Sequence, residues 1–178
     1  HKKYGEDKAV EILGKIYKLG LEVLTKFGFT SSISDIDLSP EAEEEVRKVL
    51  DQADKDVQEL IKSYRNGSLE QLTGRSMEES LEIQILQRLN KARNDAGELV
   101  EEKADPESNT MVMVRSGARG NLINVAQMSA CVGQQALRGG RIGNGYRDRS
   151  LSTFKRGDLG SSSRGFIQRG FKEGLKPH

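Results

Sequence analysis

The sequence is poor in the residues that build catalytic centres, disulfide frameworks and large apolar cores. Its 178 residues include one Cys, no Trp and only 5% aromatic residues. The two His residues, His1 and His178, stand at the two ends, so a His-based catalytic centre or zinc site cannot be assembled from this inventory. Cys131 has no partner for an internal disulfide and no accompanying base that would make it a nucleophile. A stand-alone enzyme is therefore excluded by composition.

The sequence also lacks a signal peptide and any long apolar run. We therefore expect an intracellular, soluble protein of the cytoplasm with no membrane partner. Hydrophobic residues make up 35% of the chain, which is lean for a self-sufficient domain of this size. The first residue does not resemble a natural start, and the last falls inside a sequence that should continue. We expect an excised piece that has either a charged helical surface or apolar faces covered by something outside it.

Charge of each sign is concentrated in one part of the chain. Residues 1–105 carry 16 Lys and Arg against 23 Asp and Glu, whereas residues 106–178 carry 12 against 4. The overall charge of +1 hides this asymmetry. An acidic part and a basic part imply different partners for each.

Three long helices are predicted from apolar residues that recur at three- and four-residue spacing. The first covers residues 6–28 and has an unusually wide apolar stripe. The second begins at Ser39-Pro40 and ends near Asn66-Gly67, and the third runs from Ser76, with Glu79 in a capping box, to about Ala104. The last two each carry a narrow apolar seam and are joined by a short connection. They predict a long antiparallel helical hairpin in a mainly α fold.

The remaining segments are expected to be short. Residues 28–38 indicate a strand or an extended loop. Residues 107–115 indicate the opening of a short helix with Asn109 as a possible cap, and residues 121–132 another short helix. Gly139 to Gly145 predict a tight turn into a short hairpin, residues 155–165 a mobile polar loop, and residues 166–174 a short amphipathic helix.

Residues 115–149 hold seven Gly and six Arg, with no carboxylate before Asp148. Gly permits close approach of the backbone to a partner, and Arg offers a planar fork suited to phosphate. Gly117 and Gly120 flank Arg119, where successive backbone N–H groups could form an anion-binding nest. A plainer alternative is a tight-turn connector whose Arg side chains face water. The pattern is neither a Walker loop nor a GxGxxG fingerprint.

The phrases SGARGN, INVAQMSACVGQQ, GGRI and DRSLSTF decide between these alternatives. They closely resemble the largest subunit of multisubunit DNA-dependent RNA polymerases, with wording most similar to the archaeal enzyme. The resemblance is highly specific from Ser116 to Pro177 and moderate over residues 1–115. It implies a fragment that forms the funnel around the secondary channel, through which nucleotides enter during transcription.

The resemblance also implies a division of the chain. Residues 1–38 would be the end of the pore region, 39–105 the funnel hairpin, and 106–178 a Gly/Arg-rich pore-lining segment that leads to the bridge helix. Transcript-cleavage factors dock on the funnel helices of the family. A plain structural coiled coil is the alternative for this hairpin. Other polymerase subunits, the second-largest in particular, and NTPs, DNA template and RNA are the further partners implied.

Residue roles follow from the same resemblance. Arg119, with Gly117 and Gly120, would lie near the nucleotide triphosphate, although an ion pair that rigidifies the loop is the alternative for Arg119. The pore would be lined by Asn121, Asn124, Gln127, Gln134 and Gln135. The family's Mg²⁺ ions are bound by an NADFDGD-type motif, which is absent from this sequence. This fragment should therefore bind no cofactor and should be inactive alone, as one part of a nucleotidyltransferase.

One competing interpretation remains at this stage. The chain could instead be an independent helical module that binds the phosphates of nucleic acid non-specifically through its basic part. Its affinity would then fall steeply as the salt concentration rises. Amatoxin sensitivity is not implied by the resemblance, because the sequence Ala136-Leu137-Arg138 differs from that of the eukaryotic enzymes at this place. We further expect residues 133–165 to be the least ordered part of the isolated piece.

Overall fold

The computed structural model describes residues 2–143 and 145–177. His1, His178 and Asn144, which falls in the predicted 139–145 turn, lie outside the described residues. The chain forms two compact units that divide between Ser32 and Ile33. The first unit consists mainly of helix α1, Glu6–Phe27, which begins after Gly5 and ends at Gly28 with φ 69°. The predicted helix over 6–28 is therefore confirmed, and none of its residues is buried.

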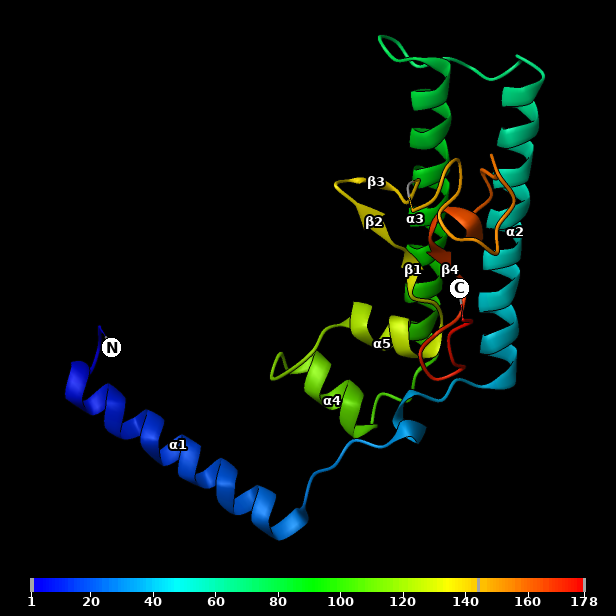
Figure 1. Ribbon diagram of the computed structural model, residues 1–178. Coiled ribbons are helices and arrows are strands. Elements are labelled where there is room, and N and C mark those ends of the chain that lie inside the picture. The colour runs from blue at the N-terminus through cyan, green and yellow to red at the C-terminus, as the bar shows by residue number, and fades with distance from the viewer. Residues whose placement is uncertain (1, 144, 178) are drawn as a thin grey trace. The chain divides into compact units, whose positions relative to one another are not determined.

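The second unit is built on an antiparallel pair of long helices, α2 (Pro40–Arg65) and α3 (Met77–Lys103), which stand side by side in Figure 1. Ser39 caps α2 by accepting from the Ala42 N–H, and Pro40 occupies its first turn. Ser76 and Glu79 form the reciprocal capping box of α3. Both predicted starts and the predicted hairpin are confirmed, because these capping signals are local and need no tertiary context.

The facing seams of the two helices make most of the core. Val57, Ile85 and Leu89 are fully buried between them. Val100 is buried at the end of the α3 seam, whereas the neighbouring Leu99 is only half-buried. Small residues, Ala53, Ala92 and Ala96, are buried along the same seams and permit close approach of the helices.

Short elements close one side of this hairpin. They are the 3₁₀ helix η1 (Ile33–Ile36), α4 (Asn109–Arg115) and α5 (Leu122–Ser129). The expected strand or extended loop over 28–38 is thus partly wrong, because Ile36 turns inward and is buried in the core. The cap of α4 is Ser108 rather than Asn109, since the Ser108 hydroxyl accepts from the Met111 N–H.

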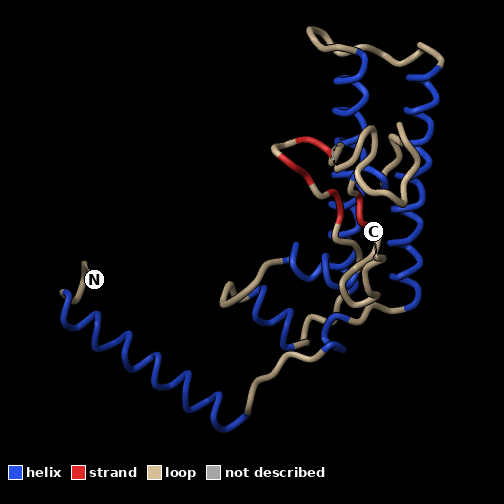
Figure 2. The backbone as a smooth tube through the Cα atoms, in the orientation of Figure 1, coloured by secondary structure: helices blue, strands red, loops and turns tan. Residues whose placement is uncertain are grey.

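The chain after α5 forms two small antiparallel pairs, drawn as red strands in Figure 2. Strand β2 (Ala136–Leu137) pairs with β3 (Gly140–Arg141) around Arg138 and Gly139, which both have positive φ. A short hairpin is thus present, but its turn lies at residues 138–139, whereas the predicted turn covered residues 139–145. Strand β1 (Gly133–Gln134) pairs with β4 (Phe166–Ile167) across more than thirty residues of chain.

The predicted helix over 166–174 is wrong. Phe166 and Ile167 form β4, and the chain then turns back to α5, where the N–H groups of Phe171 and Lys172 donate to the Gln127 and Met128 carbonyls. A Cβ at Gly170 would lie 2.6 Å from the Met128 carbonyl oxygen. This contact between distant backbones, which residue spacing does not reveal, overrides the local amphipathic pattern.

Candidate functional site: the glycine- and arginine-rich segment

The loop that carries Arg119 continues directly from the end of α4. The N–H groups of Gly117, Ala118 and Arg119 donate to carbonyls in the last turns of that helix, at distances of 3.1–3.4 Å. Gly117 and Gly120 have φ of 73° and 76°, which is why glycine suits both positions. These three N–H groups cap a helix, so they are not available as the anion-binding nest that the sequence suggested.

The Arg119 side chain, by contrast, is exposed. Within residues 2–143 and 145–177 it takes part in no ion pair or side-chain hydrogen bond. The alternative of a loop-rigidifying ion pair therefore finds no partner among these residues. What the loop offers to a ligand is one free guanidinium, held close to the helix end by backbone hydrogen bonds.

Asn121 and Asn124 satisfy each other at the start of α5. The Asn121 N–H donates to Asn124 Oδ1 at 3.1 Å, and the Asn124 N–H donates to Asn121 Oδ1 at 2.9 Å. This capping box stabilises a helix of only eight residues. The two side-chain amides therefore cap α5, a structural role that was not predicted when both residues were assigned to the pore wall.

The three candidate glutamines lie in different places. Gln127 lines a shallow pocket between α3 and α5, with Arg93, Glu98 and Cys131 among its walls. Gln134 points inward, and its Nε2 donates to the carbonyls of Gln135 at 2.6 Å and Arg164 at 2.9 Å.

Gln135 is exposed and lines the larger pocket of the Gly/Arg-rich segment. Of the glutamine pair, Gln135 is therefore the one presented to a ligand.

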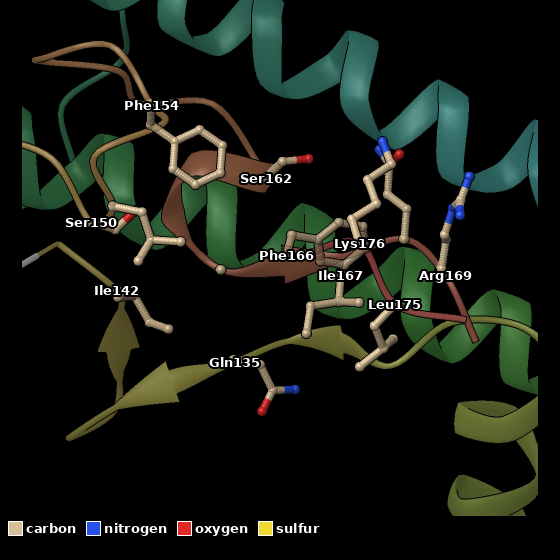
Figure 3. A pocket seen from close by; sticks show the side chains of 13 residues that line it. Gln135, Ile142, Ser150, Phe154, Ser162, Phe166, Ile167, Arg169, Leu175 and Lys176 are labelled. Atoms are coloured by element: carbon tan, nitrogen blue, oxygen red, sulfur yellow. The ribbon is translucent and has the colours of Figure 1, made fainter. Parts of the chain in front are cut away.

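This larger pocket has a volume of about 320 Å³ and is mainly apolar. Its walls come from residues next to β2 and β3, from the loop that carries Phe154, from β4 and from the C-terminal residues, as Figure 3 shows for Ile142, Phe154, Ile167 and Leu175. Arg169 and Lys176 add two cations to its lining. Sequence reasoning missed this pocket, because its walls are separated by up to forty residues and no local pattern brings them together.

Cys131 is buried, with 1% of its surface exposed. Burial raises the pKa of its thiol to about 11, against the smaller opposing effect of Arg93. The thiolate is therefore scarce at neutral pH, which agrees with the expectation that Cys131 is a packing residue.

Asp35 and Asp37, the two aspartates of the sequence SDID, have structural partners. Asp35 accepts hydrogen bonds from the Thr110 N–H and hydroxyl at 3.3 and 3.1 Å, at the start of α4. Asp37 pairs with Lys172 at 2.5 Å. In the part of the chain that the structure describes, no three His, Cys, Asp or Glu side chains are grouped to hold a metal ion. The same residues include no helix with the length and apolar character needed to cross a membrane.

Residues 60–167 match the family described as RNA polymerase Rpb1, domain 4. The chain belongs to this family. The matched range begins in the second half of α2 and ends at β4, so it includes Arg119, the glutamine pair and most of the larger pocket.

Relatives of known name are similar over nearly the whole chain. A DNA-directed RNA polymerase subunit Rpo1N from Methanothermobacter thermautotrophicus is 46% identical over 177 residues, which is 99% of this chain and 20% of that protein. The Rpo1N subunits of Halococcus morrhuae and Thermococcus celer are 43% and 42% identical over 176 residues, and this chain spans 50% and 19% of their lengths. The similarity therefore covers α1 and the whole hairpin as well as the matched family range, while the chain spans half or less of each of these relatives.

Proposed function

We propose that this chain is the funnel and secondary-channel part of the largest subunit of a DNA-directed RNA polymerase. The observation that carries the proposal is the exposed, unpaired Arg119 on a loop within the matched family range. The relatives named above support the assignment to a nucleotidyltransferase that carries out transcription. The cytoplasmic location expected from the sequence belongs to the same proposal.

In this proposal the three parts of the chain have different tasks. Residues 1–38 complete the pore region, residues 39–105 form the funnel hairpin, and residues 106–178 line the pore up to the bridge helix. Template-directed addition of nucleotides takes place elsewhere in the assembled enzyme, where Mg²⁺ is bound. This chain contributes surfaces that guide NTPs and partner proteins, and it makes contact with other polymerase subunits, the second-largest in particular.

Arg119 is the residue most directly concerned with nucleotides. A guanidinium binds phosphate oxygens through charge-assisted hydrogen bonds, and nothing in the described residues competes for this one. The glycines on either side leave room for a ligand close to the backbone. We infer that Arg119 contacts the triphosphate of an entering nucleotide, and that the exposed Gln135 and the half-buried Gln127 supply amides of the pore wall.

The test is Arg119→Ala in the reconstituted polymerase, with KM and kcat measured for addition of a single nucleotide. We expect kcat/KM to fall tenfold or more, or about 1.4 kcal/mol of transition-state stabilisation. Arg119→Lys should recover part of this loss, because it restores the charge without the fork. Arg115→Ala, which removes a charge from the end of α4, is the matched control. Unchanged kinetics for Arg119→Ala in an intact assembly would contradict the assignment.

The hairpin carries most of the negative charge of the chain. Residues 39–105 hold 17 Asp and Glu against 10 Lys and Arg, and the first-turn acids Glu41 and Glu43 are exposed. We infer that a basic surface of a transcript-cleavage factor docks on this hairpin, because charge complementarity speeds and orients such encounters.

Charge reversal on α2 tests this docking. Asp51 and Glu59 are both exposed, so Asp51→Lys with Glu59→Lys should change the surface without disturbing the core. We expect weaker factor-stimulated transcript cleavage and unchanged nucleotide addition. The control is Lys62→Glu on the same helix, which should not weaken docking. The docking role would be refuted if the factor stimulated cleavage equally in the charge-reversed and the unaltered polymerase, at both low and high salt.

A further inference from the structure

The turn formed by residues 158–164 is held by both long helices of the hairpin. The Ser161 hydroxyl donates a short hydrogen bond to Asp54 of α2. Arg141 Nη2 donates to the Leu159 carbonyl at 2.6 Å and the Gly160 carbonyl at 2.9 Å. The Nε of the same Arg141 lies 3.6 Å from Glu82 Oε2 of α3. We call these two contacts ties: the Ser161–Asp54 tie reaches α2, and the Arg141–Glu82 tie reaches α3.

One end of each tie is sheltered from solvent, whereas the Glu82 side chain is 29% exposed and Asp54 is partly exposed. The Arg141 side chain has no exposed surface, and Ser161 is 2% exposed. A buried guanidinium is costly unless it is paired. Within the described residues Nε and Nη1 of Arg141 make no hydrogen bond, so the charge is compensated by the two carbonyls at Nη2 and by the Glu82 carboxylate 3.6 Å from Nε. Burial lowers the pKa of the Arg141 guanidinium to about 10, with Glu82 opposing the shift, and the group is therefore charged at neutral pH.

The 158–164 turn is also braced within itself. The Gly160 N–H donates to Asp158 Oδ1 at 2.8 Å, and the Ser163 hydroxyl donates to the Gly160 carbonyl at 3.1 Å. The Ser150 hydroxyl donates to the Ser163 carbonyl at 2.5 Å. These bonds restrict motion between neighbouring residues, so a displacement at Ser161 carries the rest of the turn with it.

The other side of this turn borders the larger pocket. Ser162, between the buried Ser161 and Ser163, lines that pocket together with Gly165 and Phe166, which follow the turn directly. A Cβ at Gly165 would lie 2.9 Å from the Ile142 side chain, another pocket wall, so this corner has no spare room. The same stretch of backbone is therefore tied to the hairpin on one side and forms the pocket on the other.

We propose that the 158–164 turn is a strap that couples the larger pocket to the α2–α3 hairpin, with Arg141 and Ser161 as its positioning residues. A partner that shifts either helix displaces the strap and changes the pocket. The identity of that partner, and the place of the pocket in a nucleotide channel, rest on the proposed function. The coupling itself rests on the contacts described here.

A tryptophan reporter tests the strap. The chain has no Trp, so Phe154→Trp in the 178-residue chain gives a single tryptophan, excited selectively over the four Tyr, in the pocket wall. Into this background we would place Glu82→Gln and Asp54→Ala, one on each helix, and Arg141→Lys, which keeps the charge but loses the fork. The matched controls are Glu98→Gln and Glu59→Gln, which are exposed carboxylates on α3 and α2.

We expect each tie variant to raise the acrylamide quenching constant of the reporter about twofold, through local opening of the pocket wall, with helicity unchanged. The controls should leave quenching as it was. If a charge variant loses helicity, Ser161→Ala decides, because it removes one hydrogen bond and keeps the Arg141–Glu82 pair. Folded tie variants, Ser161→Ala included, with unaltered quenching would overturn the strap.

A second readout separates this inference from the proposed function. Glu82→Gln in the reassembled polymerase should lower kcat for nucleotide addition or alter its response to a cleavage factor. If the reporter responds and the polymerase does not, the strap stands and the place of the pocket in the channel is wrong. If the reporter does not respond, the strap is wrong whatever the polymerase does.

Discussion

Arginine has two opposite uses in this chain. Arg119 is exposed and without a partner in the described residues, whereas the Arg141 side chain is wholly buried and makes contact with two carbonyls and a carboxylate. The first is available to a ligand, and the second holds the fold together. Both stand in the same glycine-rich stretch, so composition alone could not separate them. The structure separates them because burial of Arg141 depends on α3 and on residues nearly twenty positions later.

Cys131 gives a prediction at the scale of one residue. Because burial raises the pKa of its thiol from 9.0 to about 11, we expect the thiolate fraction at pH 7.5 to be about a hundredfold lower than for an ordinary thiol. A thiol reagent should label the native chain correspondingly slowly and the denatured chain rapidly. Equal rates for the two would show that Cys131 is accessible.

The same shift predicts a dependence of stability on pH. The pKa of Cys131 is raised in the folded chain, so its contribution is fully present below pH 9 and is lost as pH rises toward 11. The difference in free energy of unfolding between the native chain and Cys131→Ala should shrink over that interval. A difference that grows above pH 9 would contradict the assigned direction.

Gly170 gives a second prediction for a single residue. A Cβ at this position would lie 2.6 Å from the Met128 carbonyl oxygen, which cannot move without disturbing the end of α5. Gly170→Ala should therefore lower the free energy of unfolding by about 1–3 kcal/mol. The control is Gly140→Ala, where the nearest atom would be 3.9 Å away. Similar denaturation midpoints for the two variants would refute the close approach.

At the scale of elements, the long helices could be predicted from the sequence, whereas some of the short elements could not. The caps at Ser39 and Ser76 and the repeated apolar residues determine α2 and α3 within a few residues. The region 166–174 has helical spacing too, yet it forms β4 and a return to α5. Its pairing partner, β1, lies more than thirty residues earlier, and no local signal indicates that pairing.

Among the site residues too, only features with a local cause could be predicted from the sequence. The Arg119 loop could be located from its glycines, because positive φ after a helix is a local requirement. The anion-binding nest could not be judged from sequence, since the N–H groups in question are used by α4. The strap could not be predicted from the sequence either, because its contacts join residues as far apart as Asp54 and Ser161.

The seam of the hairpin makes a prediction for α3. Leu89 is fully buried between the two helices, so Leu89→Ala should cost about 2–5 kcal/mol of stability. Glu98→Ala, on the exposed face of the same helix, should change stability by less than about 0.5 kcal/mol. Chemical denaturation followed by circular dichroism measures both. A small loss for Leu89→Ala would mean that the helices separate in solution.

At the scale of the whole molecule, charge and packing divide the second unit into two surfaces. The acidic hairpin holds the largest apolar seam, and the basic segment is fastened to it by short strands, caps and buried polar contacts. The buried apolar residues of this segment, among them Met111, Val125 and Phe166, belong to the same core cluster as the hairpin seam. We therefore expect its order to depend on the hairpin.

Hydrogen exchange on the 178-residue chain tests this dependence. We expect the slowest exchange in α2 and α3 and the fastest among residues 133–165, with intermediate protection for the amides of Gln135 and Ile142, which donate to the Gly165 and Arg164 carbonyls. Glu82→Gln should speed exchange at those two amides more than in the helices. Strong protection throughout 133–165 would contradict the expectation that this segment is the least ordered.

The most direct test of the proposed function is to map where a nucleotide touches the chain. An NTP with a photoreactive aryl azide on its terminal phosphate would be cross-linked in the reconstituted polymerase, and the labelled peptides identified by mass spectrometry. The account predicts a cross-link at residues 117–124 that unmodified NTP competes away and that Arg119→Ala weakens. Competed cross-links that fall on the hairpin alone, or on other subunits with none in residues 106–178, would contradict it.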